Sequence, residues 1–493
     1  MDWRSLFDGM RLADPDFPPR TARIQALLRV LEGTQYDHIV NDFDLEKNEA
    51  GEYIPIRQRR PSVRTHLARC VVDDVVSLLF GDNHFPTILS GNEQTRAALA
   101  DLITERAFNS LMMRAATIGS VGSVAIRLRV LKNKPFYDPL PTAFLTPEWL
   151  DDDPDTLGRV IEKYKVPAER LKALGYDVKV EDGDHWFQRI WDDAAETWYL
   201  PWPVKDANAT PRVDKSRTLL HGLGFVPILW VKNLPGCDET DGDSTFSRAL
   251  DTLVELDYLL SQAGRGLKYS SDPTLVIKGQ QDEAPGGHQG GSASALIVPP
   301  EGDVKLLEIN GTAAGAVLNH VRELRTTALE LMHGNRAHPD KMTAAQSGRA
   351  MELLNQGLVW LAGKLRVAYG EGALKSLLLM TCQASQVVKG GLLIGGKKVV
   401  LDPAGLMLKW PDWYPPTADD RFAEVNALNA GIVGGIVSRE TAVQTAMEFY
   451  KIDDFEAELS RIKTDMAEAD ARAKAQAEAE AAAKPKPLGK PAA

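Results

Sequence analysis

The chain has 493 residues, of which 44% are hydrophobic and 25% charged, with a formal net charge of -11. The composition is that of a globular protein, and the length predicts about two to four domains. The acidic balance excludes a general nucleic-acid coat protein, which needs a basic surface to release phosphate counterions, but it permits a small local contact with DNA. The three cysteines, Cys70, Cys237 and Cys382, are odd in number and widely spaced, which is typical of a reducing compartment without a disulfide framework.

No segment of the sequence predicts secretion or membrane insertion. Residues 1–17 have neither the basic start nor the apolar core of a signal peptide. The most apolar stretch, 353–382, is interrupted by Lys364, Arg366, Glu371 and Lys375, whereas a spanning helix needs about 20 apolar residues in succession. We therefore expect a soluble protein inside the cell, with no membrane partner.

In the first part of the chain, the hydrophobic pattern predicts helices followed by a strand. Residues 1–60 predict a helical start and then a polar loop with several prolines. Residues 64–81 predict an amphipathic helix that ends at Gly81. A second helix is predicted over 95–120, and it leads directly into an alternating strand over 121–130.

Between residues 135 and 235 the pattern is typical of strands. The tryptophan-rich segment 184–204 predicts a hairpin that turns at residues 192–196, and residues 223–233 predict an apolar strand. Together with the helices before it, this region is expected to be a mixed α/β domain.

From residue 244 the pattern predicts two long helices with a small β module between them. The first helix covers 244–268, with Ser244 or Thr245 as its N-cap, and the second begins near Ala313. In chain order, the module consists of a strand over 273–279, a Gly-rich loop over 284–294 and a strand pair over 296–309.

The last third of the chain begins with a polar segment and a long apolar helix. Residues 333–347 contain Gly, Pro and two histidines but no aromatic residue, and the helix that follows over 348–382 can kink at Gly370 and Gly372. The remaining predictions are a strand pair with a Pro-rich turn over 397–420, short helices over 421–433 and 438–450, and an end in which alanine occupies every odd position from 467 to 481. That end predicts a mobile tail or a marginal helix.

Residues 391–398, with the letters GLLIGGKK, match the spacing of a phosphate-binding loop but not its context. Lys398 stands where such a loop needs a Ser or Thr to bind magnesium. A helix precedes the segment and a strand follows it, whereas a phosphate loop joins a strand to a helix. A glycine hairpin turn is the better interpretation.

The sequence contains no motif of catalysis or metal binding. There is no Gly-x-Ser-x-Gly elbow, no His-Glu-x-x-His and no paired Cys-x-x-Cys. His333 and His338 lie five residues apart across a turn without fixed geometry, which favours solvated histidines over a metal site. The acidic run 151–155 is a solvated turn or, as a less favoured alternative, a divalent-cation site. We therefore expect no enzyme activity, no cofactor and no metal.

Several stretches, in a characteristic order, resemble the portal proteins of tailed double-stranded DNA bacteriophages, of the type common in long-tailed siphoviruses. In chain order they are ARCVVDDVVSLLFGD, GSVGSVAIRL, LGFVPILWVKNLP, ALDTLVELDYLLSQAGRGLKYSSDPTLVIKG, SGRAMELL, LKWPDWYPPTADD and GIVSRETAV. The Ser-Gly-x-Ala that opens a long helix after a polar loop is the most specific of them. The resemblance extends from about Arg64 to about Tyr450, so it assigns no role to the first 60 residues or to the Ala-, Lys- and Pro-rich end.

The resemblance implies an α+β portal fold with a wing, a stem of long helices, a small β clip and a helical crown, assembled as a ring of twelve copies. The implied regions are the N-terminal part of the wing over 1–243, stem helix 1 over 244–270, the clip over 271–312, stem helix 2 over 313–332, the tunnel loop over 333–348, the long wing helix with closing strands over 349–420, the crown over 421–465 and the low-complexity tail over 466–493. The ring is expected to be the channel at one capsid vertex through which double-stranded DNA is packaged and ejected.

The partners implied by the resemblance are further copies of the chain, double-stranded DNA, the terminase large subunit, the head-tail connector, the major capsid protein and a scaffold protein. The implied location is the portal vertex of the virion and, during assembly, the host cytoplasm.

The tunnel loop and the second stem helix supply the candidate DNA-contacting residues, which are Arg322, Arg325, His333, Arg336, His338 and Lys341. Between Ala313 and Arg349, five Arg or Lys residues stand against three acids, a surplus of two positive charges. No aromatic side chain in this segment offers a stacking platform for bases. Such a lining favours weak, sequence-independent contact with a moving duplex.

The other candidate residues concern docking and assembly. The implied clip docking loop contains Gly286, Gly287, His288, Gly290 and Gly291, and it is too rich in glycine to hold one shape before a partner binds. The apolar stripes of the two stem helices supply the candidate subunit contacts, which are Leu253, Leu260, Val321 and Leu324.

Two other functions stay open at the level of sequence. One is an intracellular structural scaffold or adaptor that binds proteins without DNA, and a monomer or dimer without a central hole would favour it. The other, less favoured, is a nucleotide hydrolase that uses residues 391–398, which requires ATP binding that is lost in Lys397→Ala.

Overall fold

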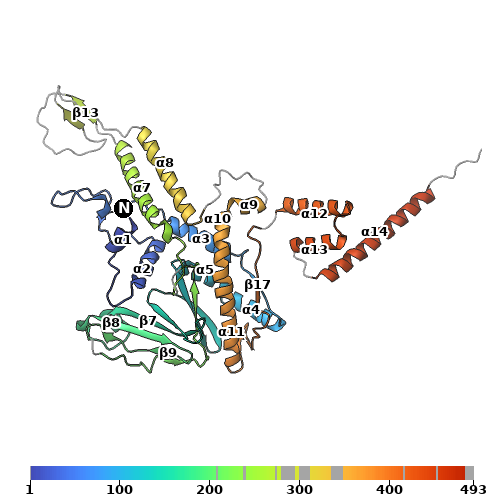
Figure 1. Ribbon diagram of the computed structural model, residues 1–493, viewed down its shortest axis with the longest axis horizontal. Helices are drawn as coiled ribbons and strands as arrows, with labels where there is room; N and C mark the ends of the chain where they lie inside the picture. The colour runs from blue at the N-terminus through green and yellow to red at the C-terminus, as the bar shows by residue number, and fades with distance from the viewer. Residues whose placement is uncertain are drawn as a thin grey trace, which may run out of the picture. The chain divides into compact units, whose positions relative to one another are not determined.

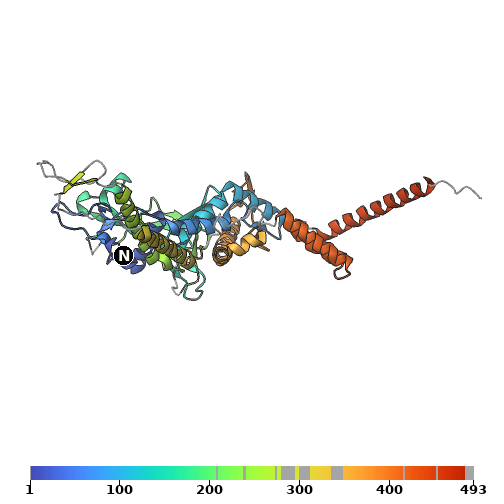
Figure 2. The ribbon, with the colours of Figure 1, turned by 90° about the horizontal axis from the view of Figure 1, so that it is seen from above.

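The computed structural model describes residues 2–206, 209–236, 240–271, 275–278, 295–298, 311–334, 348–414, 417–450 and 454–483 (Figures 1 and 2). These residues form both helices and sheets, which confirms the mixed helix-and-sheet class. The chain divides into two compact units: the first comprises Met1–Arg336 and Asn355–Trp413, and the second comprises Ala337–Leu354 and Tyr414–Ala493. None of the helices in the described ranges is both long and apolar enough to cross a membrane.

The first 60 residues pack on helix α7 (Leu250–Ser271) and give this region a structural role that the sequence did not reveal. They contain α1 (Trp3–Gly9) and α2 (Pro19–Glu32), with the short strands β1 (Asn41–Asp42) and β2 (Arg59–Arg60). The buried side chains that join the region to α7 are Leu6, Met10, Ala26, Tyr36, Ile39, Phe43, Val254 and Tyr258. The N-terminal region is therefore part of the core around α7.

An ion pair fixes α2 to the sheets of the first unit. Arg20 donates from Nε and Nη2 to the two carboxylate oxygens of Asp241, at 2.6 and 2.8 Å. Its Nη1 donates to the carbonyl oxygens of Thr142 and Leu145. Asp241 is buried and also accepts from the Ser123 hydroxyl at 2.5 Å. Because both oxygens of the buried Asp241 carboxylate accept hydrogen bonds, its charge is compensated, and the ion pair holds α2 in one position.

Helix α3 (Leu67–Phe80) confirms the helix predicted over 64–81. The prediction of a single helix over 95–120 is wrong, because the structure has α4 (Glu93–Glu105) and α5 (Phe108–Gly119) with a break between them. Ala107 at the break has φ 48°, a left-handed conformation that ends one helix and redirects the chain into the next.

Two antiparallel sheets follow. The smaller has the order β12-β4-β5, formed by β4 (Ser123–Leu131), β5 (Lys134–Pro141) and β12 (Ile228–Lys232). Strands β4 and β12 confirm the strands predicted over 121–130 and 223–233. The central strand β4 is buried on both faces over its first six residues. The buried side chains Ala125, Leu145, Val160, Trp191, Val226 and Ile228 form one cluster that joins this sheet to the larger one.

The larger sheet has the order β11-β9-β8-β7-β6, with β10 also paired to β8. Its strands are β6 (Leu145–Trp149), β7 (Leu157–Pro167), β8 (Asp184–Trp191), β9 (Ala195–Trp198), β10 (Trp202–Pro203) and β11 (Leu219–Leu220), with the short helix α6 (Ala168–Ala173) after β7. The predicted hairpin is confirmed as β8 and β9, and the Asp192 carboxylate accepts the N–H groups of Ala194 and Ala195 at its turn.

Helix α7 begins later than predicted. A 3-10 turn over Ser247–Ala249 precedes it, and the α-helix starts at Leu250. The prediction of Ser244 or Thr245 as its N-cap is wrong, because the hydroxyl of Ser244 accepts only from the Phe246 N–H and that of Thr245 accepts from Asn233 Nδ2. These hydroxyls serve the loop before the helix instead.

The second long helix, α8 (Gly311–Leu331), lies beside α7 in both views (Figures 1 and 2), and it confirms the start predicted near Ala313. Between the two helices in the chain are β13 (Leu275–Lys278) and β14 (Ala295–Val298), which pair in parallel. The second strand predicted within 296–309 lies outside the described residues, as does the Gly-rich loop.

The long helix predicted over 348–382 is interrupted. The structure has α9 (Gly348–Leu354), α10 (Gln356–Leu365), a π-helical stretch η5 (Arg366–Lys375) and α11 (Ser376–Val387). The irregular stretch contains both glycines at which a kink was predicted. A Cβ on Gly370 would lie 2.4 Å from the Trp410 ring, so the glycine lets this ring pack on the wider helical turn.

The strand pair predicted over 397–420 is wrong. Strand β16 (Lys397–Val399) pairs with β15 (Leu392–Ile394), and β17 (Met407–Lys409) pairs with β3 (Thr87–Leu89), which lies far away in the sequence. Both strands exist, but each has a partner that their proximity in sequence does not indicate.

The second unit contains α12 (Ala418–Val433), α13 (Arg439–Tyr450) and α14 (Phe455–Ala483) in its described part. The first two confirm the short helices predicted there. The boundary predicted between crown and tail at residue 466 falls inside α14, which is one continuous helix. Of the two alternatives predicted for the alanine-rich end, a mobile tail or a marginal helix, the structure has the helix as far as Ala483.

Candidate functional site

The candidate site is the surface of α8 and the turn that follows it. The C-terminal end of α8 is fixed in the first unit, where Ala328 and Met332 are buried. Toward its N-terminus the helix is largely open, since every residue from 316 to 320 is exposed. The helix is therefore anchored at its C-terminal end and packs on α7, and its exposed residues, among them 316–320, are open to another molecule.

The open part of α8 has faces of different chemistry. Arg322 and Arg325 are exposed and, three residues apart, lie on one face of the helix. The exposed acids Glu323 and Glu330 lie on another face, so the described helix has two positive and two negative side chains and no net charge. The surplus of two positive charges predicted for this region depends on residues beyond the helix.

Three of the predicted DNA-contacting residues, Arg336, His338 and Lys341, lie outside the described residues. Of the predicted set the structure therefore describes Arg322 and Arg325, on α8, and His333, in the turn that ends this helix.

A hydrogen-bonded cap at His333 and Gly334 ends α8. The His333 N–H donates to the carbonyl oxygen of Glu330 at 3.1 Å, and the Gly334 N–H donates to that of Leu329 at 2.8 Å. This is the Schellman arrangement, in which the residue after the helix adopts a left-handed conformation. His333 does so with φ 54°, although glycine is the residue that usually occupies this position.

Gly334 holds the turn against the body of the unit. A Cβ at this position would lie 2.4 Å from Cγ2 of Val71 in α3, so only glycine allows this close approach. On the other side, a Cβ on Gly357 in α10 would lie 3.5 Å from the His333 carbonyl oxygen. The point where the chain leaves α8 is therefore fixed between α3 and α10.

Two basic residues from other segments act electrostatically on His333, and one of them, Arg248, is itself paired with Asp243 at 3.0 Å. The pKa of His333 is lowered by burial and then by the charges of Lys364 in α10 and Arg248 in the turn before α7. Lys364 and Arg248 are both exposed. Sequence reasoning missed these two residues, because they come from segments about 30 and 85 positions away and only the fold brings them to the end of α8.

The side chains predicted to contact a neighbouring subunit differ in how exposed they are in the single chain. Leu253 is buried within the single chain, so it has little area to offer a neighbour. Leu260, Val321 and Leu324 are half-buried. The more exposed apolar side chains of this helix pair are Leu267, Val317, Leu318 and Leu331. An interface on this pair therefore involves α8 more than α7.

A buried hydrogen-bond chain connects the π-helical stretch to the base of α7. Tyr369 is fully buried, and its hydroxyl donates to Asn233 Oδ1 at 3.0 Å. The Asn233 side-chain amide in turn donates to the Asp243 carbonyl oxygen and to the Thr245 hydroxyl, at 2.9 and 3.0 Å. Burial alone raises the pKa of Tyr369, so the phenol stays protonated and able to donate.

A second buried group, Asp257, connects the middle of α7 to the N-terminal region. One of its carboxylate oxygens accepts from the N–H and the hydroxyl of Thr65, at 2.9 and 2.8 Å, and the other accepts from the Tyr36 hydroxyl at 3.0 Å. Burial raises the pKa of Asp257, while these hydrogen bonds act in the opposite direction. Burial therefore makes the ionised form of Asp257 unfavourable in free energy, and the hydrogen bonds from Thr65 and Tyr36 offset part of this cost.

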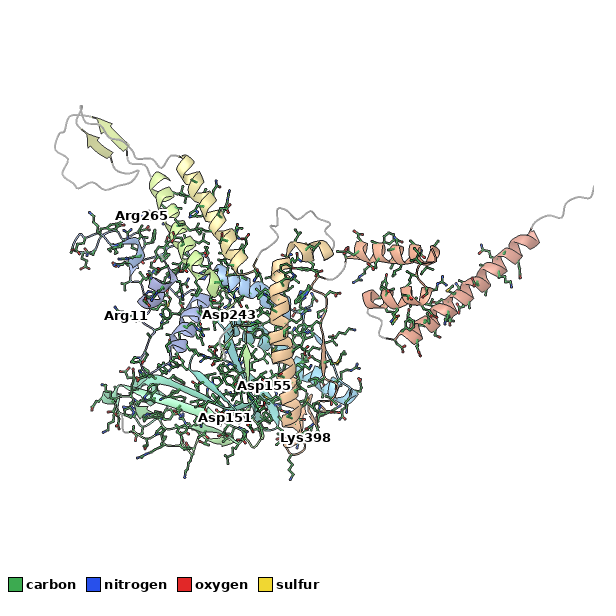
Figure 3. All side chains as sticks on the ribbon, in the orientation of Figure 1. Arg11, Asp151, Asp155, Asp243, Arg265 and Lys398 are labelled. Atoms are coloured by element: carbon green, nitrogen blue, oxygen red, sulfur yellow. The ribbon has the colours of Figure 1, made fainter. Side chains whose placement is uncertain are left out.

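The segment 391–398 is a hairpin, as predicted. Gly395 and Gly396 form its two-residue turn with φ values of 56° and 76°, which suits a tight hairpin between β15 and β16. The Gly395 N–H donates to the Glu105 carboxylate at 2.9 Å. This backbone N–H is therefore already hydrogen-bonded, whereas a phosphate loop would need it to bind phosphate. Lys398 lies at this hairpin after α11 (Figure 3).

The acidic run at Asp151 and Asp155 lies in an exposed turn between two strands of the larger sheet (Figure 3). Asp153 uses its own carboxylate within the turn, where it accepts from the Thr156 hydroxyl at 2.6 Å. In the part of the chain that the structure describes, no group of three or more His, Cys, Asp or Glu side chains is arranged to hold a metal ion.

The predicted docking residues Gly286, Gly287, His288, Gly290 and Gly291 lie outside the described residues. Comparison with known proteins finds no protein-family model that matches the sequence and no curated protein that is similar to it at a significant level.

Proposed function

We propose that the protein is a portal protein, whose copies form a ring-shaped channel at one capsid vertex through which double-stranded DNA is packaged and ejected. The observation that carries the proposal is the α7–α8 pair. Two long helices lie side by side, a strand pair stands between them in the chain, and the second helix has its fully buried side chain near its C-terminal end among those that the structure describes. This arrangement supports the assignment of the pair to a stem and of the strands to a clip.

The chemistry at the end of α8 supports contact with DNA. Arg322 and Arg325 are exposed along the helix, and Lys364 adds a positive charge where the chain leaves it, whereas Arg248 nearby is paired with Asp243 at 3.0 Å. In a ring, symmetry repeats these charges around the channel axis, and a sparse positive lining attracts phosphate without holding it in place. The residues after Gly334, which the resemblance assigns to the tunnel loop, start from this positive end.

The same proposal assigns the partners. In it the strands between α7 and α8 dock the terminase motor during packaging and the head-tail connector afterwards, and the major capsid protein and a scaffold surround the ring. The location is the portal vertex of the virion, reached from the host cytoplasm.

Assembly through α8 is the testable core of the proposal. Val317→Asp would introduce a charge into the apolar stripe of α8, and we expect it to block ring formation because the charge has no partner there. Val317 suits the test because it is more exposed than Leu324, whose replacement would also disturb the chain's own packing. Asn319→Asp is the matched control, since it adds the same charge two residues away on the opposite side of the helix.

Sedimentation velocity distinguishes the outcomes. The proposal expects Val317→Asp to sediment as a smaller species with unchanged helicity and Asn319→Asp to sediment with the wild type. Full-size assemblies of Val317→Asp would remove this stripe from the subunit boundary. A nucleotide hydrolase, the less favoured alternative, would instead show ATP binding that Lys397→Ala abolishes.

A further inference from the structure

The N-terminal region covers one face of α7 along most of its length. The residues of that face follow each other in steps of four and three, and they are Val254, Tyr258, Ser261, Arg265 and Lys268. The first two pack in the cluster that joins the region to α7. The Ser261 hydroxyl accepts from the Val63 N–H at 3.0 Å. Nearer the end of the helix, Glu46 pairs with Arg265, and Asp44 pairs with Lys268 at 3.7 Å.

Residues 40–56, which contain Asp44 and Glu46, form an arm beside α7. Figure 1 shows the arm to the left of α7 and α8 to the right of α7, and Figure 2 again shows the arm to the left of both helices. The arm and α8 therefore lie on different sides of α7 within the first unit.

The arm exposes large apolar side chains that the described part of the chain leaves open. Val40 is 88% and Tyr53 62% exposed, and Leu45 and Ile56 are exposed as well. Arg59 stacks on the Tyr53 ring at 4.9 Å, so one face of this ring is already covered. Single apolar side chains on a surface are ordinary, but four of them on one short arm favour a contact with another protein surface.

Val317 and Leu318 of α8 are also exposed, and they lie at the same level of the helix pair as the arm. Figure 1 shows the end of α7 and the start of α8 together, beside β13. Arg265, which holds the arm, is six residues before the end of α7, and Leu318 is seven residues after the start of α8. At about 1.5 Å per residue, both lie about 10 Å from that end of the pair.

Two apolar surfaces on different sides of one unit suit a head-to-tail contact between copies. When the arm of one copy covers α8 of the next, each copy still has one free arm or one free α8, so the same contact repeats. A contact between two arms is opposed by charge, because the arm has one lysine against five acids, which are Asp42, Asp44, Glu46, Glu49 and Glu52.

Charge instead favours α8 as the partner of the arm. Arg322 follows Leu318 by four residues and lies on the same side of the helix. Arg322 and Glu49 are both exposed and have no ion pair among the residues that the structure describes. Opposite charges guide two surfaces together without a direct pair, so this attraction leaves Arg322 available to DNA.

We infer that the arm of one copy covers the exposed surface of α8 around Val317 and Leu318 in a neighbouring copy. The inference rests on the proposed function, because it names the surface that covers the apolar stripe of α8 in the ring. It also gives residues 40–56, to which the sequence assigned no role, a part in assembly.

Cross-linking of the full-length chain tests the contact. Leu318→Cys is combined with one arm variant at a time, which is Val40→Cys, Leu45→Cys, Tyr53→Cys or Ile56→Cys, in a chain that carries Cys70→Ser and Cys237→Ser. The remaining Cys382 is buried. A short bismaleimide joins cysteines that lie close together, and a denaturing gel then shows which chains are linked.

We expect at least one of the four pairs to give a ladder of dimers, trimers and higher multiples, because each copy is then linked to both neighbours. Leu318→Cys alone should stay a monomer on the gel. Leu220→Cys with Leu318→Cys is the matched control, since Leu220 is 80% exposed but lies in the larger sheet. We expect no ladder from it.

Every other outcome has a distinct meaning. Absence of a ladder from all four pairs overturns the inference, and if rings are still seen by electron microscopy, the proposed function survives. A linked monomer of altered mobility overturns it, because the arm then covers α8 of its own chain. A product that stops at the dimer overturns the head-to-tail arrangement, and an equal ladder from the Leu220 control overturns the specificity of the contact. A ladder from assemblies that are not rings supports the contact between arm and α8 and contradicts the proposed function.

Discussion

The buried contact between Tyr369 and Gly119 allows a prediction whose size follows from the structure. A Cβ on Gly119 would lie 2.0 Å from the Tyr369 hydroxyl oxygen, 3.0 Å from its ring carbon Cζ and 3.1 Å from Val124 Cγ1. Real Cβ atoms do not approach an oxygen this closely, so Gly119→Ala has to displace the tyrosine. We expect a loss of about 3 kcal/mol in the free energy of unfolding, the upper end of the usual cost of overpacking a core.

Tyr369→Phe tests the other side of the same contact. It leaves Asn233 Oδ1 buried without the hydroxyl that donates to it, which costs about 1–3 kcal/mol. In the Tyr369→Phe background the 2.0 Å contact no longer exists and only the approach to the ring carbon persists. Gly119→Ala should then cost less than in the wild type, by about 1–2 kcal/mol of coupling energy.

Denaturant unfolding of the two single variants and the double variant measures this coupling. Gly363→Ala is the control, since a Cβ there meets nothing within 4 Å. In the interior of α10 it should stabilise the protein by about 0.5–1 kcal/mol. Strictly additive losses would refute the contact between Gly119 and Tyr369.

Three further predictions concern the candidate site. Arg322→Glu combined with Arg325→Glu changes each copy by four charges, and we expect poor DNA packaging that improves with salt, whereas wild-type packaging at low salt would remove α8 from the DNA path. Asp257→Asn should remove the free-energy cost of a buried negative charge. The pKa of Asp257 is raised in the folded state, so the free energy of unfolding of the wild type relative to the variant should fall as the pH rises above about 4. Parallel pH profiles of the two proteins would contradict this. His333→Gly should raise the free energy of unfolding by about 0.5–1 kcal/mol, because glycine adopts the left-handed cap conformation without strain, and a loss of stability would contradict the cap assignment.

Local signals predicted most of the elements. The helix that ends at Gly81, the β8–β9 hairpin and the turn at Gly395 and Gly396 all depend on residues within a few positions of each other. The break at Ala107 has no such signal, because alanine usually continues a helix. The pairing of β17 with β3 was also unpredictable, since its partner lies more than three hundred residues earlier in the chain.

The candidate site was predictable only in part. The sequence identified Arg322, Arg325 and His333, which are close in the chain. Arg248 and Lys364 reach the end of α8 through tertiary packing, and single-sequence reasoning has no means to place them there. Likewise the burial of Leu253 depends on packing within the chain that its helical periodicity does not reveal.

Assembly into a ring is the central claim. End-on electron microscopy of the purified chain at low salt, without other proteins, tests it most directly. The proposed function predicts closed rings of about twelve copies around a central hole, because head-to-tail contacts between identical subunits generate a ring when the rotation between neighbours closes. Particles the size of a monomer or dimer with no hole would contradict it and favour a scaffold or adaptor that does not contact DNA.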